Sequence, residues 1–183
     1  MRGKQFHMLR AFRIAILAVA TSTVLACTSE PEVSPGLFDL SEPAGDIVLE
    51  VTGAIAVHNG QNGAHFDMAM LRALPTVSLS TGTSVTDGIS NFEGFLLRDF
   101  LAGLGANGKT LRASALNDYV VDIPMSDIER FDVIVAHSMD GEPLSLQDKG
   151  PLWIVYPRDA HPELQDIRYD YRWVWQLNAL EVQ

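Results

Sequence analysis

The chain has 183 residues, and its 13 basic and 23 acidic side chains give it a formal net charge of −10. Nine of the basic and all of the acidic residues follow residue 26, so the rest of the chain carries a charge of −14. This balance excludes the basic footprint of a nucleic-acid-binding protein. The length after residue 26 suits about one domain with a hydrophobic core of its own.

A basic segment followed by an apolar one opens the sequence. Residues 1–13 hold four basic side chains and no acidic one, and residues 14–26, IAILAVATSTVLA, are uncharged. That order is typical of a secretory signal peptide, and the apolar run is short for a transmembrane helix. Residues 24–27, VLAC, resemble a bacterial lipobox, whose cysteine receives a diacylglycerol and becomes the mature N-terminus. We therefore predict a lipoprotein signal peptide at 1–26 and lipidation of Cys27. An ordinary cleaved signal and an uncleaved anchor are the alternatives.

The lipobox predicts a protein of the bacterial cell envelope, on the periplasmic side and lipid-anchored to a membrane. An aspartate after the cysteine retains bacterial lipoproteins at the inner membrane, so Thr28 favours the outer membrane. Cys27 is the only cysteine, so the domain that follows must be stable without a disulfide. Residues 27–45 contain three prolines and several acids, a composition typical of a flexible tether.

From residue 46 onward, short strand patterns alternate with short helical patterns. This mixture predicts a single α+β domain at 46–183, with mixed short strands and a few short helices. Strands are predicted at 46–57, 76–81, 109–115, 118–124, 131–139, 152–157 and 171–182, helices at 64–75 and 95–106, a capped turn with Ser126 as N-cap at 126–130, and a loop at 82–94.

Two of these elements have specific signals. The run FLLRDFLAGLGA places its leucines and Phe100 at helical spacing, with glycines at its end. Asp140-Gly141 is a strong hairpin signal. The apolar pattern predicts burial of Leu97, Phe100, Leu101, Leu104, Trp153, Val155 and Trp175.

Two segments resemble a known family. Residues 91–106, NFEGFLLRDFLAGLGA, match an aromatic-x-Gly-x-x-Leu-x-x-Leu-Leu pattern. Residues 139–159, MDGEPLSLQDKGPLWIVYPRD, and the closing RWVWQLNALEV at 172–182 match a hairpin, a Gly-Pro-Leu strand and a final strand. In this order they resemble the molybdopterin-binding domain of the sulfite oxidase family, from about residue 46 to the C-terminus.

The resemblance implies a wrapped β arrangement with flanking helices and a pyranopterin cofactor. It also implies a cysteine thiolate, in the loop before the aromatic-x-Gly segment, that binds molybdenum. Here that loop corresponds to residues 80–92, which contain serine and threonine hydroxyls and no cysteine. Because soft thiolate is the ligand that fits this metal chemistry, its absence points away from a molybdenum enzyme.

Other departures from the family pattern agree. Trp153 stands where the family usually has an arginine, and Val174-Trp175 replaces a Lys-Trp pair. Nine basic residues are few for a domain that holds a phosphate-bearing pterin. Molybdenum cofactors are inserted in the cytoplasm and such enzymes leave folded by the twin-arginine route, whereas this signal has no twin-arginine motif.

No other catalytic motif stands out. The sequence has no P-loop, dinucleotide fingerprint or nucleophile elbow. His58 and His65 flank a turn without the spacing of zinc ligands, so we predict no metal site. Alternating aromatic residues at 169, 171, 173 and 175 would face one way on a strand and either pack in the core or form a ligand surface.

The resemblance places a cleft between loop 80–92 and residues 114–119 and 147–153. Hydroxyl, amide, imidazole and cationic groups there would orient a small polar or anionic ligand. The alternative is that the loop packs the cleft shut. The candidate binding residues are Thr81, Thr83, Asn117, Tyr119, His137, Lys149 and Arg158. No residue is assigned a catalytic role.

These observations predict a cell-envelope lipoprotein with a molybdopterin-oxidoreductase-like domain that is non-catalytic. It would bind a small polar or anionic ligand or an envelope protein, without nucleic acid. No cofactor is expected, although molybdopterin is implied by the resemblance. The alternatives are a molybdopterin-dependent oxidoreductase with a serine or threonine ligand to the metal, and a pterin binder without metal.

Overall fold

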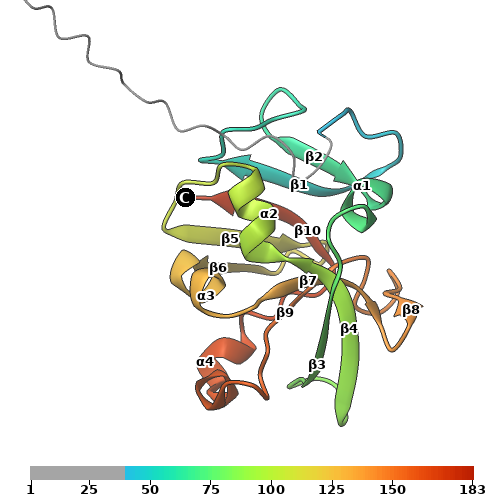
Figure 1. Ribbon diagram of the computed structural model, residues 1–183, viewed down its shortest axis with the longest axis vertical. Coiled ribbons are helices and arrows are strands. Elements are labelled where there is room, and N and C mark those ends of the chain that lie inside the picture. The colour runs from blue at the N-terminus through green and yellow to red at the C-terminus, as the bar shows by residue number, and fades with distance from the viewer. Residues whose placement is uncertain (1–39) are drawn as a thin grey trace, which may run out of the picture. The chain divides into compact units, whose positions relative to one another are not determined.

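Two β-sheets form the framework of residues 40–183, the part of the chain that the computed structural model describes (Figure 1). The first sheet has the strand order β2-β1-β10-β5-β6; the second has the order β3-β4-β7-β8, with β9 also paired to β7. The strands are β1 (Ile47–Gly53), β2 (Ala64–Asp67), β3 (Val77–Gly82), β4 (Ile89–Leu96), β5 (Thr110–Ala115), β6 (Val120–Pro124), β7 (Ile134–Met139), β8 (Glu142–Pro143), β9 (Trp153–Val155) and β10 (Leu177–Val182).

Short helices occupy several of the connections between strands. The helix that follows β4 lies where the two sheets meet, because the Phe100 ring packs 5.0 Å from that of Phe66 in β2 and 4.9 Å from that of Phe95 in β4. This combination of sheets and short helices confirms the α+β class. The helices are α1 (Met68–Arg72), α2 (Leu97–Gly103), α3 (Met125–Arg130), the 3-10 helix η1 (Pro162–Gln165) and α4 (Ile167–Asp170).

The first sheet is completed by the last strand in the sequence. β10 lies between β1, to which it runs parallel, and β5, to which it runs antiparallel. Val51 pairs with Leu180 on one side, and Leu180 pairs with Ala113 on the other. All three side chains are buried, so the centre of this sheet is formed by segments from both ends of the domain.

The second sheet depends on a close approach between β4 and β7. Gly94 pairs with Ala136, and a Cβ on Gly94 would lie 2.0 Å from the carbonyl oxygen of Val135. The register shifts between Glu93 and Gly94 at this point, as it does at a β-bulge. The glycine of the aromatic-x-Gly motif is thus required by strand packing, whatever the domain binds.

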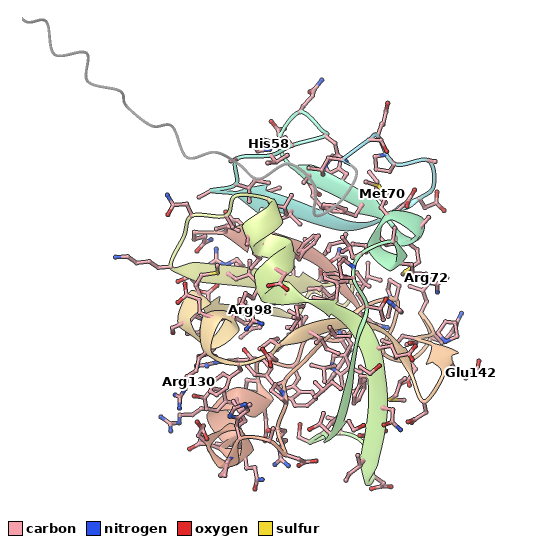
Figure 2. All side chains as sticks on the ribbon, in the orientation of Figure 1. His58, Met70, Arg72, Arg98, Arg130 and Glu142 are labelled. Atoms are coloured by element: carbon pink, nitrogen blue, oxygen red, sulfur yellow. The ribbon has the colours of Figure 1, made fainter. Side chains whose placement is uncertain are left out.

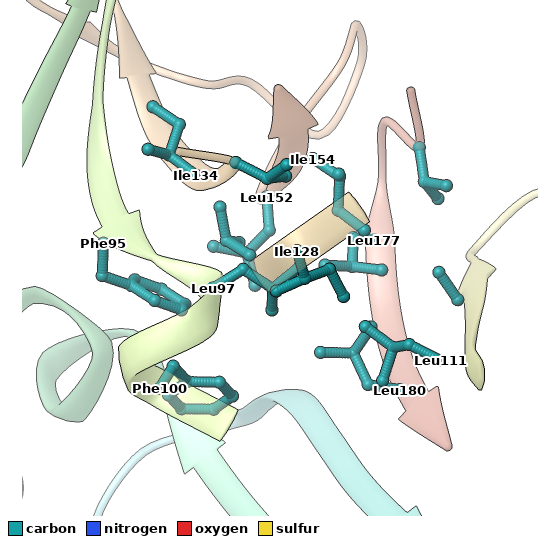
Figure 3. Close-up of a cluster of buried hydrophobic side chains, with 14 of the residues drawn as sticks. Phe95, Leu97, Phe100, Leu111, Ile128, Ile134, Leu152, Ile154, Leu177 and Leu180 are labelled. Carbon is teal, nitrogen blue, oxygen red and sulfur yellow. The ribbon is translucent and has the colours of Figure 1, made fainter. Parts of the chain in front are cut away.

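The core lies between the sheets and α2 (Figure 3). Figure 3 shows Leu97 of α2 pointing toward Leu152, Ile154 and Leu177. The Phe100 ring instead packs against Phe66 and Phe95. Six of the seven residues predicted to be buried are at most 1% exposed, which confirms their placement. Trp175 is the exception: it is only partly buried and lies at the edge of the core.

Several element boundaries differ from those predicted. Residues 64–67 are strand β2, so the helix predicted at 64–75 begins only at Met68. The predicted loop 82–94 ends earlier than expected, because strand β4 begins at Ile89. The strand predicted at 171–182 begins at Leu177, because residues 167–170 form α4 and the residues after it form an irregular segment.

Helix ends also differ in detail. Ser126 was expected to cap α3, but the N-cap is Pro124 and has no side-chain hydrogen bond. The Asp140-Gly141 hairpin is confirmed: both residues have positive φ, 53° and 85°, between β7 and β8. That is the backbone region which two-residue hairpin turns require.

Asp67 connects the start of the described chain to the domain. Its carboxylate accepts hydrogen bonds from the backbone N–H groups of Ala44 (2.9 Å), Gly45 (2.8 Å) and Met70 (2.9 Å). The last residues of the segment expected to be a tether therefore lie against β2 and α1. Residues 1–39, which hold the predicted signal and Cys27, lie outside the described part of the chain.

Arg72, Arg98, Arg130 and Glu142 lie on the outside of the domain (Figure 2). Arg98 of α2 pairs with Asp132 at 2.9 Å, and Arg130 of α3 pairs with Glu163 at 2.6 Å. Such exposed pairs contribute little to stability, so the core dominates. Within residues 40–183 no helix has the length and apolar character needed to cross a membrane.

The α2 core contact can be tested with a matched pair of leucines. Replacement of Leu101, which is 1% exposed, by alanine should lower the free energy of unfolding by about 2–5 kcal/mol, because it leaves a cavity. Leu146→Ala, at a site that is 58% exposed, should change it by less than about 0.5 kcal/mol. Urea unfolding measures both, and equal effects would show that α2 is misplaced.

Asp67 predicts a pH dependence of stability. Hydrogen bonds from the backbone of Met70, and then of Gly45, lower the pKa of its carboxyl below the usual 3.8. The folded pKa is the lower one, so the stabilisation is present above pH 3.8 and is lost as the pH falls through the folded pKa. Asp67→Asn should be less stable than wild type at pH 7, and the difference should shrink in acid. Asp87→Asn, on an exposed loop, serves as the control, and a difference independent of pH would contradict the assignment.

Candidate functional site

A cavity of about 350 Å³ opens between three segments that connect strands. The segments are the loop from β3 to β4, the turn from β5 to β6, and the stretch that runs from α4 to β10. Aromatic and aliphatic side chains make up most of its wall, with three polar groups among them. The lining residues are Ser84, Val85, Asn117, Tyr119, Ile167, Asp170, Tyr171, Trp173 and Trp175.

Hydroxyl groups shape the β3–β4 loop. The Thr83 hydroxyl accepts hydrogen bonds from the N–H groups of Val85 (3.1 Å) and Thr86 (2.9 Å), which folds residues 83–86 into a turn. The carboxylate of Asp159 accepts from Gly82 N at 2.6 Å and holds the start of the loop. Ser84 and Val85 at the tip of this turn are the two loop residues that line the cavity.

An ion pair holds the aromatic wall in place. Arg172 pairs with the carboxylate of Asp127 in α3, which is only 7% exposed and also accepts a hydrogen bond from the Tyr156 hydroxyl at 3.3 Å. Burial and the nearby Asp127 carboxylate raise the pKa of Tyr156 well above its usual value, so its hydroxyl stays protonated. The pair between Arg172 and Asp127 thus fixes the segment that carries Tyr171 and Trp173 to α3.

The other end of this wall is fixed by backbone bonds. Gln176 has a positive φ of 52°, a conformation that a non-glycine residue adopts only when its surroundings hold it. Its N–H donates to Lys149 O at 2.9 Å, and its carbonyl accepts from Leu116 N at 2.9 Å. Its side chain donates to Leu146 O at 3.0 Å. Gln176 therefore joins three segments beside Trp175.

The β5–β6 turn is tied to the aromatic wall through Tyr119. The Tyr119 hydroxyl donates to the Tyr171 carbonyl at 2.6 Å. Burial is the main reason that the pKa of Tyr119 lies above its usual value. Asn117 accepts from Tyr119 N at 3.1 Å and so orders the turn.

A second hollow of about 280 Å³ adjoins the cavity and shares Val85 and Trp175 with it. It is also lined by Asp148 and Lys149. The Lys149 ammonium lies 2.7 Å from the Asp148 carboxylate and 5.8 Å from the Trp153 ring centroid. Lys149 is therefore paired with an acid and is not a free cation in the cavity.

Arg158 forms a long ion pair with Asp170 of the cavity wall. Its Nε is 3.8 Å from Oδ1 of Asp170, and both atoms are buried without a hydrogen-bond partner among the described residues. The two charges attract each other, but the geometry is too long for a hydrogen bond. Asp170 lines the cavity and Arg158 does not.

The structure brings some of the predicted site residues together and separates others. Asn117 and Tyr119 line the cavity, and Lys149 lines the adjoining hollow. Thr81 is fully buried, where its hydroxyl accepts from Asp159 N at 3.2 Å, and Thr83 supports the loop from within. The placement of the β3–β4 loop opposite residues 114–119 agrees with the prediction.

His137 lies outside this site. It belongs to β7, where burial first, and the nearby Arg72 second, lower the pKa of its imidazole. The ring therefore stays neutral at neutral pH. It is not among the residues that line either hollow.

Most of the other lining residues were found only in part from the sequence, or not at all. The alternating aromatic pattern indicated Tyr171, Trp173 and Trp175 as an alternative ligand surface, but through a strand that the structure does not have. Tyr169 of the same pattern instead packs against Phe131, with ring centroids 6.0 Å apart. Asp170 had no sequence signal, because its role depends on where α4 ends.

The donor groups around the cavity do not fit a molybdenum centre. They are a serine hydroxyl, an amide, a carboxylate and two phenols, and no thiolate is present among them. Residues 40–183 contain no group of three or more His, Cys, Asp or Glu side chains that could hold a metal ion. A phosphate-bearing pterin would also meet Asp170 as the only charged side chain lining the larger cavity.

Comparison with known proteins identifies the fold. The model of the oxidoreductase molybdopterin binding domain family matches residues 49–161, more than half of the chain. The crystal structure of the sulfane dehydrogenase SoxCD from Paracoccus pantotrophus superposes with a TM-score of 0.56 at 19% identity. The similarity covers 73% of this chain but only 37% of the SoxCD chain. A search of curated proteins gives no match.

The family match and the structural similarity confirm the predicted resemblance and the sulfite-oxidase-like fold. The match ends at residue 161, so the aromatic wall at residues 167–175 lies beyond it. The chain belongs to the oxidoreductase molybdopterin binding domain family.

Proposed function

We propose that the protein is a lipid-anchored protein of the bacterial cell envelope whose domain is a non-catalytic binding module. The binding site is the cavity between the β3–β4 loop, the β5–β6 turn and the residues after α4. Its occupant is a small molecule taken from the periplasmic side, and an envelope protein is the partner that would respond to binding.

The cavity is the observation that carries this proposal. A loop that merely filled the place of a lost cofactor would leave no space, and the domain would then be a scaffold. Instead, about 350 Å³ stay open beside Ser84 and Val85, within the size range of small-molecule pockets. Apolar walls with a few convergent polar groups are the usual composition of such pockets.

The donor set supports a role without redox catalysis. The family places a cysteine thiolate in the loop before the aromatic-x-Gly segment, and this loop offers Ser84 to the cavity. A hydroxyl is a hard donor that suits molybdenum–sulfur chemistry poorly. Gly94 of the aromatic-x-Gly segment is accounted for by its contact with β7 and needs no cofactor.

The location rests on the sequence of residues 1–27. The basic segment, the apolar run and the VLAC tetrapeptide support export and lipidation at Cys27. Residues 28–39 would then separate the lipid from the point where Asp67 binds the chain to the domain.

Metal and ligand content test the binding role. The full-length chain, purified from its native envelope, should contain far less than one molybdenum atom per molecule by mass spectrometry. A co-purified small molecule should be detected by native mass spectrometry and should be lost in Trp175→Leu. About one molybdenum per chain would overturn the proposal in favour of an oxidoreductase, and Ser84→Ala would then show whether the serine holds the metal.

Lipidation is tested separately. Wild-type protein should partition with membranes and carry the mass of a diacylglycerol on Cys27. Cys27→Ser should be released into the soluble fraction or remain unprocessed, whereas the neighbouring Thr28→Ser should behave as wild type. A wild-type chain without lipid that fractionates like Cys27→Ser would contradict the anchor.

A further inference from the structure

We infer that the cavity selects a small organic cation of the alkylammonium type over an anion. This inference rests on the proposed binding function and adds the charge and class of the ligand. It departs from the anionic ligand considered from the sequence, because the cations expected in the site do not line the cavity.

The charges on the cavity wall favour a positive ligand. Asp170 is the only lining residue with a formal charge at neutral pH, and no lysine or arginine is among the nine. Arg158 offsets part of this charge through an ion pair with Asp170 at 3.8 Å, but the pair is too long for a hydrogen bond and Arg158 does not line the cavity. An anion entering the cavity would meet the carboxylate, whereas a cation would be attracted by it.

The adjoining hollow does not change this balance. Its Lys149 is paired with Asp148 at 2.7 Å, so the two charges largely cancel. The chain as a whole is acidic, with a net charge of −10. Such a field raises the local concentration of cations and lowers that of anions.

The aromatic residues provide the second source of cation affinity. Two tyrosines and two tryptophans line one cavity: Tyr119, Tyr171, Trp173 and Trp175. Trp173 is 3% exposed and lies deep in the wall, whereas Tyr171 is 61% exposed and lies at the mouth. Aromatic faces attract cations through their quadrupole, and aromatic-lined sites that hold quaternary ammonium groups use this attraction.

Most of the aromatic wall follows the stretch of sequence that the family model matches. Tyr171, Trp173 and Trp175 lie beyond the residues matched by the family model, which end at 161. They are held by contacts of this chain: the Arg172–Asp127 pair on one side and the bonds of Gln176 on the other. The feature that favours a cation is therefore built by residues outside the family match.

The first test compares two ligands of equal shape. Choline and its uncharged carbon isostere, 3,3-dimethyl-1-butanol, are titrated into the full-length protein by calorimetry at constant ionic strength. Choline should bind with a Kd about tenfold lower than the isostere, because only the cation gains the charge and aromatic attraction. Tryptophan fluorescence gives a second readout, since two of the three tryptophans line the cavity.

Matched variants identify the residues responsible. Asp170→Asn should weaken choline binding about tenfold while hardly changing that of the isostere. Asp87→Asn removes the same charge from an exposed loop residue that does not line the cavity, and should leave choline binding within about twofold. Trp175→Phe should keep the preference for choline over the isostere, whereas Trp175→Leu should lose it. This comparison distinguishes attraction by an aromatic face from apolar contact alone. Thermal unfolding confirms that each variant is folded.

The outcomes separate the inference from the proposed function. Dihydroneopterin phosphate is titrated as an anionic pterin in the same way. Equal binding of choline and its isostere, or preferential binding of this anion, would overturn the inferred cation class but not the proposed binding function. If none of the three compounds binds and native protein carries no small molecule, both the inference and the binding function fail.

Discussion

The cavity depends on one buried carboxylate. Asp127 in α3 is 7% exposed and is matched by Arg172 and the Tyr156 hydroxyl, so its charge is compensated on both sides. Breaking such a buried pair by removing one partner leaves a charge without compensation, which is strongly unfavourable. Because Arg172 lies between Tyr171 and Trp173, this pair also determines where the aromatic wall stands. A single ionic contact thus connects the stability of the core to the shape of the site.

The strands and the core were largely predictable because their signals are local. Alternation in β5 and helical spacing in α2 place apolar side chains on one face, and Leu111 and Leu101 are buried as that pattern requires. The hairpin at Asp140-Gly141 followed from the conformational preference of two residues. Errors arose where a long-range contact decides the structure: β2 is a strand because it pairs with β1, although its sequence continues into a helix.

The site was harder to predict because its residues come from irregular segments. The alternation of Tyr169, Tyr171 and Trp173 suggested a strand, yet the chain there makes a short helix and a turn held by Arg172. Tyr169 accordingly faces Phe131 instead of the cavity. Thr81 and Thr83 were predicted to bind a ligand, but their hydroxyls accept hydrogen bonds from the backbone. Thr83 accepts from Val85 in its own loop, and Thr81 accepts from Asp159.

The position of β10 has a consequence for how the chain acquires its structure. The last strand of the sequence fills the middle of the first sheet, between β1 and β5. Until it arrives, those two strands have no common neighbour, and the segment that bears Trp173 and Trp175 has no fixed end. Contacts between such distant parts of a chain form slowly. A chain that is synthesised from its N-terminus therefore cannot complete this sheet before residues 177–182 are available, and the cavity wall gains its second fixed end only with them.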